Sequence, residues 1–307
     1  KLDLMGGRLP FLPHWFQQLV LSLVWTDARN VALGCDLFGW RAPTACGALE
    51  TGPSVEELRA ALPEFAAVYA RRPIAHNMWG MNTNHAFALW YTVRALQPTH
   101  IVESGVLRGL GTWLLRQAAG PEVQIFSHDP MWEGALSWRD NSTRARYFMG
   151  DDFADCGKMD WSDLIPESQR ASTLFVLDDH TSALTRVRQL SEQGFVHLWF
   201  DDNSVKGADF YTMAAICTPL DEGVGEVPYQ EDLNSNMTRI SRGEHQANLD
   251  FVLSRMEAYF EYPPIFDGCG WARPPLLSDE AELARLGLPH LRDDVYHYRH
   301  MHPPYVK

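Results

Sequence analysis

The residues best suited to chemistry stand at the ends of short apolar segments. Four of five such segments end in acids, namely Glu103, Asp129, Asp178-Asp179 and Asp201-Asp202, and Asp151-Asp152 lies just beyond the fifth. The carboxyl ends of parallel strands meet at one edge of a sheet, where ligands bind. We therefore expect these acids to gather at one rim. Because like charges repel, a bound cation or hydrogen-bond-donating ligand groups would explain them.

A glycine-rich turn follows the first of these acids. Glu103 precedes Gly105, Gly109 and Gly111, and a helix is predicted over 112–119. Glycines let a backbone approach a ligand closely, and a helix start offers free N–H groups. A dinucleotide fingerprint places its acid about 20 residues after G-x-G-x-x-G, whereas this acid precedes the first glycine. The other interpretation is an ordinary turn whose glycines only permit tight packing.

The two aspartate pairs give the sharpest signal. Asp178, Asp179, Asp201, Asp202 and Asn203 would place oxygen ligands close together, which suits a hard divalent cation such as Mg²⁺. The alternative is that Asp179 caps the following helix and Asp202 caps a turn. We predict a metal site because both pairs fall at the same edge.

The acid and the glycine turn resemble motif I of the class I S-adenosylmethionine (SAM)-dependent methyltransferases. In that family the turn cradles the amino-acid end of SAM, and the strand-end acid, here Glu103, holds its ammonium directly or through water. The resemblance implies that Asp129 accepts hydrogen bonds from the ribose hydroxyls, although it could instead cap the next turn. It also implies that Asp152 and Phe153 contact the adenine, with Asp151 serving equally well.

The aspartate pairs resemble those of metal-dependent O-methyltransferases, including catechol-type enzymes, sugar O-methyltransferases of antibiotic pathways and the cephalosporin-hydroxylase-like group. In these enzymes, acids after strands four and five hold a metal that also binds two substrate oxygens. Because two acids follow each of these strands, the metal ligand after strand four could be Asp178 or Asp179. After strand five it could be Asp201 or Asp202, with Asn203. The resemblance covers about residues 86–204.

Methyl transfer to a hydroxyl requires an aligned acceptor oxygen and removal of its proton. A bound cation lowers the pKa of an aliphatic hydroxyl and fixes its oxygen. His180 is the predicted proton acceptor, with Lys206 and His128 behind it. A histidine beside an aspartate more often orients or caps, which is the alternative role of His180. The lysine that catechol-type enzymes carry shortly after the strand-four acid is absent here.

Strands alternating with helices must position these residues. This alternation predicts a doubly wound, Rossmann-like α/β fold, and the resemblance implies a mostly parallel seven-stranded sheet with a helical N-terminal extension. Weaker patterns suggest a strand within 295–306 on the sheet edge. We predict strands at 100–104, 123–127, 147–149, 173–177 and 196–200, and helices at 15–24, 54–72, 86–96, 112–119, 183–193, 209–217 and 247–262.

We divide the chain into three parts. Residues 1–85 form an N-terminal helical extension or cap, residues 86–215 form the SAM-binding core, and residues 216–307 form an elaboration that completes the sheet.

Composition excludes several partner classes. Hydrophobic residues make up 46% of the chain, charged residues 21%, and the net charge is −13. Nucleic acid and anionic membrane surfaces would repel such a chain. No run approaches the roughly 20 apolar residues of a membrane span. We expect a small-molecule or glycan acceptor, and a homo-oligomer stays open.

Compartment is left open by the sequence. The five cysteines include no C-x-x-C pair, so a zinc ribbon or thioredoxin-type site is not supported, and a Cys35–Cys46 bridge is a guess. Two N-glycosylation sequons begin at Asn141 and Asn236. The sequence begins with Lys1 rather than Met, which leaves open a preceding targeting segment. A secretory or Golgi lumen and the cytoplasm are the two candidates.

The residues together predict a SAM-dependent O-methyltransferase, assisted by a divalent metal, that acts on a hydroxyl of a sugar or other small polyol or phenol. The alternative is a catalytically silent methyltransferase-like subunit of a larger assembly. An NAD or nucleotide-sugar enzyme on the same architecture is disfavoured by the glycine spacing and by the lack of a Tyr-x-x-x-Lys pair.

Overall fold

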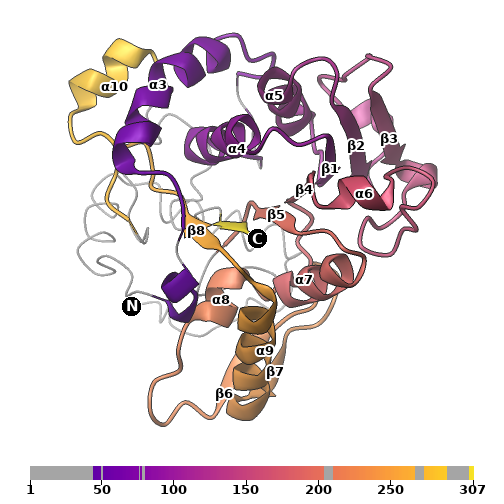
Figure 1. The fold of residues 1–307 in the computed structure, drawn as a ribbon, viewed down its shortest axis with the longest axis vertical. Coiled ribbons are helices and arrows are strands. Elements are labelled where there is room, and N and C mark those ends of the chain that lie inside the picture. Colours follow the sequence, from indigo (N-terminus) through magenta and orange to yellow (C-terminus); the bar gives the residue numbers. More distant parts are fainter. Residues whose placement is uncertain are drawn as a thin grey trace, which may run out of the picture.

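The computed structural model describes residues 44–49, 51–75, 77, 80–203, 210–266, 273–288 and 304–307. Its centre is a seven-stranded sheet of order β3-β2-β1-β4-β5-β9-β8 (Figure 1). Strands β1 to β5 are parallel, and β9 runs antiparallel to both of its neighbours. The predicted mostly parallel α/β fold is confirmed. The strands are β1 (His100–Ser104), β2 (Gln124–Asp129), β3 (Ala145–Met149), β4 (Thr173–Leu177), β5 (His197–Phe200), β8 (Tyr259–Glu261) and β9 (Pro304–Val306).

Each face of the sheet is buried under helices. Successive side chains of a strand point to opposite faces, so Ile101 and Val102 of β1 enter two different hydrophobic clusters. In β5 the same alternation separates Trp199 from Phe200. Burial on both faces explains why these strands read as continuous apolar runs in the sequence.

Two groups of helices cover the two faces (Figure 1). The first cluster takes side chains from α3, α4, α5 and α10, and the second takes them from α7, α8 and α9. The helices are η1 (Ala45–Leu49), α3 (Val55–Tyr69), α4 (Thr83–Leu96), α5 (Leu110–Ala119), η2 (Glu133–Ala135), η3 (Gly150–Asp152), α6 (Glu167–Arg170), α7 (Ala183–Glu192), α8 (Met213–Cys217), α9 (Arg242–Arg255) and α10 (Glu280–Leu286).

Side-chain caps fix where the first helices begin. Ser54 and Glu57 form the predicted capping box of α3. The side chain of Asn82 caps α4 by accepting hydrogen bonds from the backbone N–H groups of Asn84 and His85. Such caps satisfy N–H groups that have no partner within the helix. The cap starts α4 three residues earlier than predicted, and it places His85 in the first turn.

The C-terminal region departs from the prediction. The helix predicted over 247–262 is present in part as α9, but a second capping box at Ser241 and Glu244 starts it earlier, and the end of the predicted range forms β8. The last strand is present as β9 but lies between β5 and β8, so its placement on the sheet edge is wrong. Pro304, which has no N–H to donate, is the first residue of β9, a position at which sheets tolerate proline. The predicted helix at 15–24 lies outside the described residues.

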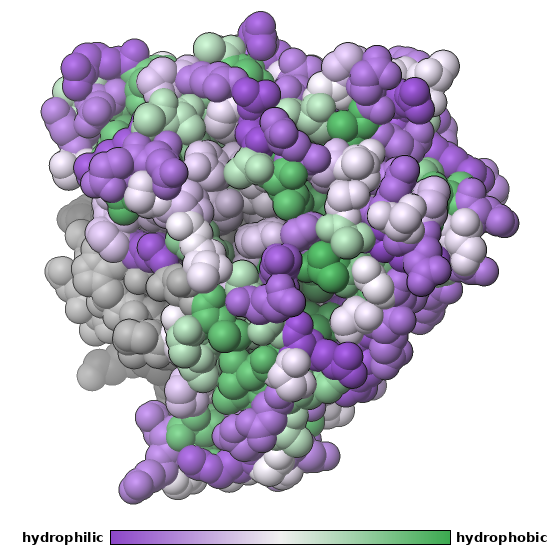
Figure 2. Space-filling model, viewed as in Figure 1, coloured by the Kyte–Doolittle hydropathy of each residue, from purple (hydrophilic) through white to green (hydrophobic). Residues whose placement is uncertain are grey.

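A two-stranded hairpin of β6 (Glu226–Tyr229) and β7 (Thr238–Ser241) packs beside α9 and was not predicted. Its connecting loop is tied to α7, since Glu231 accepts a hydrogen bond from Thr185 and Asp232 forms a β-bridge with Thr181. Figure 2 shows the molecule from the same side as Figure 1. Hydrophilic residues form most of the outline, and hydrophobic residues gather in the lower centre, over α8 and α9.

A disulfide joins Cys46 of η1 to Cys217 at the end of α8. The suggested Cys35–Cys46 bridge is therefore wrong, because spacing along the chain does not reveal which cysteines meet in space. Cys35 lies outside the described residues, and Cys156 is a buried free thiol. Among the helices that the structure describes, none is long and apolar enough to cross a membrane.

Candidate functional site

The sheet register brings acids from three strands to one rim. Ser104 of β1 pairs with His128 on one side and with Leu177 on the other, and Leu177 pairs with Phe200. The acids Asp129, Asp178 and Asp201 each come one residue after these partners. They therefore stand side by side at the carboxyl edge of the sheet, where ligands bind in folds of this kind.

The glycine turn lies close to the backbone of two other segments. Gly105 and Gly109 have φ angles of 95° and 93°, a region that side chains rarely adopt. A Cβ at Gly105 would lie 2.1 Å from the carbonyl oxygen of Asp178, and one at Gly109 would lie 2.1 Å from that of Trp138. The chain's own carbonyl groups take this space, so the packing interpretation accounts for both glycines.

Glu103 is a buried acid beneath the turn. Its Oε2 accepts hydrogen bonds from the hydroxyls of Thr112 at 2.6 Å and Ser127 at 2.7 Å. A Cβ at Gly111 would lie 2.7 Å from the other carboxylate oxygen, so this glycine leaves room for the acid. Burial raises the pKa of Glu103 to about 7, against the lowering effect of the two hydroxyls. An ammonium beside it would offset the cost of burying its charge.

Asp129 holds the glycine turn in place. One of its carboxylate oxygens accepts the backbone N–H groups of Val106 at 2.7 Å and Leu107 at 2.9 Å, and the other accepts that of Met131 at 2.8 Å. This is the capping role that the sequence left as an alternative. Since an ionised carboxylate has about four acceptor sites, a ribose hydroxyl can still be accommodated, and that role stays a prediction.

The predicted adenine contacts lie in and after η3. Asp151, Asp152 and Phe153 are all exposed, and Gly150 packs against the backbone of Trp132 in the loop after β2. Equal exposure leaves the choice between Asp151 and Asp152 open.

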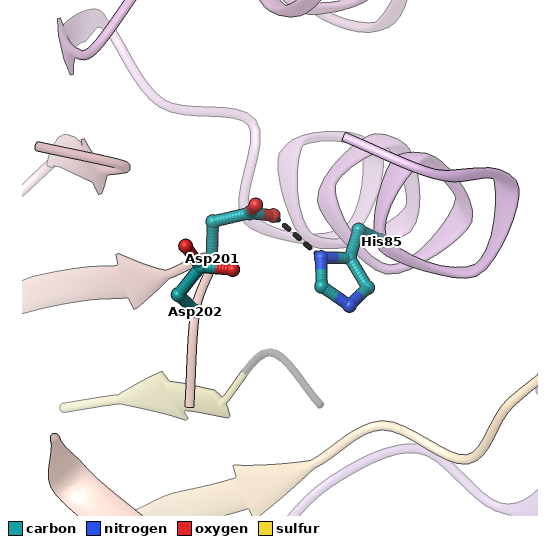
Figure 3. A group of neighbouring side chains, drawn as sticks. All are labelled: His85, Asp201 and Asp202. Atoms are coloured by element: carbon teal, nitrogen blue, oxygen red, sulfur yellow. Dashed lines mark hydrogen bonds and ion pairs between the residues drawn. The ribbon is translucent and has the colours of Figure 1, made fainter. Parts of the chain in front are cut away.

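Two overlapping groups of side chains could hold a metal ion. One comprises His85, Asp201 and Asp202, and the other comprises Asp178, His180 and Asp202. Within each group the ligand atoms lie within 4.8 Å of one another. His85 Nδ1 lies 2.8 Å from Asp201 Oδ1 (Figure 3), and His180 Nε2 lies 3.5 Å from Asp202 Oδ2. Asp202 thus belongs to both groups, which we call the rim cluster.

Like charge is concentrated in the rim cluster. Burial, followed by the charges of Asp201 and Asp202, raises the pKa of Asp178 well above that of a free aspartic acid. Asp201 and Asp202 are themselves buried, at 4% and 7% exposure. A cation among these carboxylates would relieve the repulsion between them.

Two predicted ligands, Asp179 and Asn203, have other partners in the structure. Asp179 Oδ2 accepts hydrogen bonds from Ser104 and Arg186, both at 2.6 Å. Asn203 is fully buried, and its Oδ1 accepts the backbone N–H of Ala214 at 2.6 Å. Asp178 is therefore the strand-four acid of the rim cluster, and Asn203 holds the start of α8.

The predicted proton acceptors have different surroundings. His180 has a φ of 51°, uncommon for a residue other than glycine, and its side chain is one-third exposed beside Phe210. His128 is fully buried, stacks on Phe148, and faces the backbone carbonyl of Ala154 at 2.8 Å. Burial lowers the pKa of His128 to about 4, so its imidazole is neutral at pH 7. Lys206 lies outside the described residues.

His85 was not predicted from the sequence. It is 1% exposed and lies on the same face of α4 as the core residue Leu89, four residues later. The prediction began the helix at residue 86 and so left His85 outside it. A histidine on the buried face of a helix, opposite predicted rim acids, is the signal that could have identified it.

No family model matches this chain, and no curated protein matches it. Solved structures do give matches of low identity. Cofactor-bound Rv0187 from MTB is 11% identical, with 73% of this chain and 93% of that chain covered and a TM-score of 0.33. The N-terminal domain of EvdMO1 with SAH and D-fucose is 14% identical, with 67% and 88% covered and a TM-score of 0.35.

The O-methyltransferase TomG from Streptomyces achromogenes, in complex with SAM, is 13% identical, with 66% and 83% covered and a TM-score of 0.34. TM-scores of this size do not establish a common fold. The fold of this chain therefore rests on its own strand order, and its chemistry on its own rim.

Proposed function

We propose that this chain is a SAM-dependent O-methyltransferase that uses a divalent cation at the rim cluster. One observation carries the proposal: the carboxylates of Asp178, Asp201 and Asp202 converge at the rim with two histidines, in two groups whose ligand atoms lie within 4.8 Å of one another. Carboxylates this close repel one another, and a bound cation would relieve that repulsion. The buried Glu103 lies at the end of the neighbouring strand, where the resemblance expects the ammonium of SAM.

The donor chemistry fits a divalent ion. Asp178 and Asp202 offer carboxylate oxygens, the ligands that Mg²⁺ prefers. His85 contacts Asp201 through Nδ1, and residues that hydrogen-bond to a metal ligand often orient it in this way. Mg²⁺ stays our first choice because carboxylates dominate the cluster.

The fit to SAM depends on two buried acids. Glu103 has two hydroxyl partners, and the charge that acts on it most is the negative charge of Asp129. A ligand with an ammonium at one end and ribose hydroxyls in its middle would meet both acids along the rim. The exposed indole of Trp132, just after β2, can stack on the apolar face of a sugar acceptor.

The chain's own residues would divide the work as follows. When bound, SAM supplies an electrophilic methyl group and the cation lowers the pKa of the acceptor hydroxyl. Asp178 and Asp202 hold the cation, Asp201 is oriented by His85, and His180 at the exposed side of the cluster receives the acceptor proton. Glu103 fixes the amino-acid end of SAM so that the methyl group and the acceptor oxygen are aligned.

The test is calorimetric titration of SAM, with and without Mg²⁺ or Mn²⁺, on the parent, Asp202→Asn and the matched control Asp163→Asn, which removes an exposed acid away from the rim. We expect SAM to bind all three proteins. Methyl transfer to a panel of sugar and catechol acceptors should be stimulated by the cation in the parent and control, and should fall at least 100-fold in Asp202→Asn. Equal turnover in parent and Asp202→Asn would remove the metal from the proposal.

The second candidate is a catalytically silent subunit with this fold. Two observations favour it: the chain's own carbonyls fill the space at Gly105 and Gly109, and Asp129 is already engaged by the turn. No detectable SAM binding by the correctly folded parent would select this candidate over the enzyme.

A further inference from the structure

The Cys46–Cys217 disulfide restricts where this chain can mature. Both cysteines are fully buried, and the bond joins η1 to α8 across a sequence separation of 171 residues. Disulfides form and persist in secretory, extracellular and periplasmic compartments, and they are rare in the reducing cytosol. A buried bridge between distant segments is structural, and we therefore place the chain in an oxidising compartment.

Both sequons are presented to solvent. Asn141, Ser142 and Thr143 are all exposed, in the connection that leads into β3. Asn236, Met237 and Thr238 are also exposed, where the hairpin loop enters β7. An N-linked glycan requires the sequence N-x-[ST] on an accessible segment, and here both copies meet that requirement.

The two asparagines lie in different parts of the fold. Asn141 precedes the start of β3, at the amino edge of the sheet and thus opposite the rim. Asn236 lies in the loop between β6 and β7, with the exposed apolar side chains of Leu233 (53%) and Met237 (58%) nearby in sequence. A glycan at Asn236 would cover apolar surface that otherwise faces water.

We propose that this chain matures in the lumen of the eukaryotic secretory pathway and carries N-linked oligosaccharides at Asn141 and Asn236. The two thiols of Cys46 and Cys217 give two protons and two electrons to the disulfide of an oxidoreductase, which leaves as a dithiol. Each asparagine amide nitrogen bonds to C1 of an oligosaccharide carried on a polyprenyl diphosphate. The C1–oxygen bond to the carrier breaks, the lipid diphosphate leaves, and the amide proton passes to a base.

The test uses protein isolated from the cells that make it. Free thiols are alkylated before any reduction, and peptides are analysed with and without peptide N-glycosidase in ¹⁸O water. We expect Asn141 and Asn236 to appear only after the enzyme, as ¹⁸O-labelled aspartate, and Cys46 and Cys217 to be found in one linked, unalkylated peptide pair. The exposed Asn234, which starts no sequon, is the internal control and should remain unlabelled.

Each contrary outcome overturns a defined part. Unmodified Asn141 and Asn236 in the untreated sample, with the disulfide present, would overturn the glycans and indicate an oxidising compartment without this modification. Alkylated Cys46 and Cys217 would overturn the compartment. Expression of the variants Asn141→Gln and Asn236→Gln in the same cells should each remove one glycan-sized step on a gel, whereas the matched Ser142→Ala and Asn234→Gln should keep both steps.

Discussion

Two groups of acids near the rim have different partners. On one side of the rim, Asp155 and Asp179 bind the two ends of the Arg186 guanidinium, at 2.5 and 2.6 Å. In the rim cluster, Asp178 and Asp202 are grouped with His180 instead. The first group is paired with an arginine, whereas the second is grouped with an imidazole, which carries a charge only when it is protonated.

The adjacent residues Asp178 and Asp179 show what this difference means. They follow the same strand, yet one side chain joins the rim cluster and the other joins Arg186. The number of acids at a strand end therefore does not define a site. What each acid can do depends on the partner that the fold gives its side chain, because a buried charge is costly unless something pairs with it.

The largest expected effect comes from removing the guanidinium of Arg186, which pairs with Asp155 and Asp179. Arg186→Met should lower the free energy of unfolding by about 4 kcal/mol, because it leaves Asp155 and Asp179 without their partner in a largely buried setting. Urea denaturation at pH 7 measures this. The control is Arg188→Met on the same helix, whose exposed guanidinium lies over the Phe251 ring and should cost less than about 1 kcal/mol. Equal losses in the two variants would mean that the paired group contributes no special stability.

The next effect concerns the pH dependence caused by the buried acid Glu103, whose carboxylate accepts hydrogen bonds from the hydroxyls of Thr112 and Ser127. The pKa of Glu103 is raised in the folded state to about 7, from 4.5 for the free group, so the folded protein binds the proton more tightly. Stability should therefore fall as the pH rises from about 4.5 to 7, by roughly 3 kcal/mol in total.

The variant Glu103→Gln should lose this slope and be relatively more stable at pH 7, as measured by denaturation at a series of pH values. Glu222→Gln, which changes an exposed acid, should keep the parent's slope. Parallel curves for the parent and Glu103→Gln would show that Glu103 is not held protonated by the fold.

The smallest effect is also the most direct comparison, because it changes two neighbouring residues in opposite directions. Asp179→Asn should destabilise the fold by about 2 kcal/mol, since Arg186 loses one charged partner. Asp178→Asn should stabilise the metal-free protein, since it removes a charge that Asp201 and Asp202 repel. Thermal unfolding in the presence of a chelator would reveal both signs. A loss of stability in Asp178→Asn would contradict the repulsion inferred among these three carboxylates.

Many helices and strands could be predicted because the spacing of apolar residues and the capping of helices are properties of short stretches of chain. Strands β1 and β4 match the predicted residues, and the box at Ser54 and Glu57 starts α3 as expected. The C-terminal region could not be predicted in the same way. The order in which β8 and β9 join the sheet depends on contacts between distant segments, and the sequence of β9 alone does not say which neighbours it will have.

The candidate site was predictable in position but not in detail. Strand ends located Asp129, Asp178 and Asp201, since parallel strands share a carboxyl edge. The direction of each side chain depends on partners far along the chain, as Arg186 shows for Asp179. His85 joins the cluster from a helix that precedes the whole sheet, and no local pattern connects it to Asp201.

The placement of β9 has a consequence for how the molecule is made on the ribosome. Synthesis is vectorial, so β5 and β8 are complete before the strand that must separate and pair them emerges. During that interval both present open backbone edges that can capture another chain. The nascent protein therefore needs a holding chaperone most in the interval before residues 304–306 emerge, and a stop codon just before residue 304 would leave the edges of β5 and β8 unpaired.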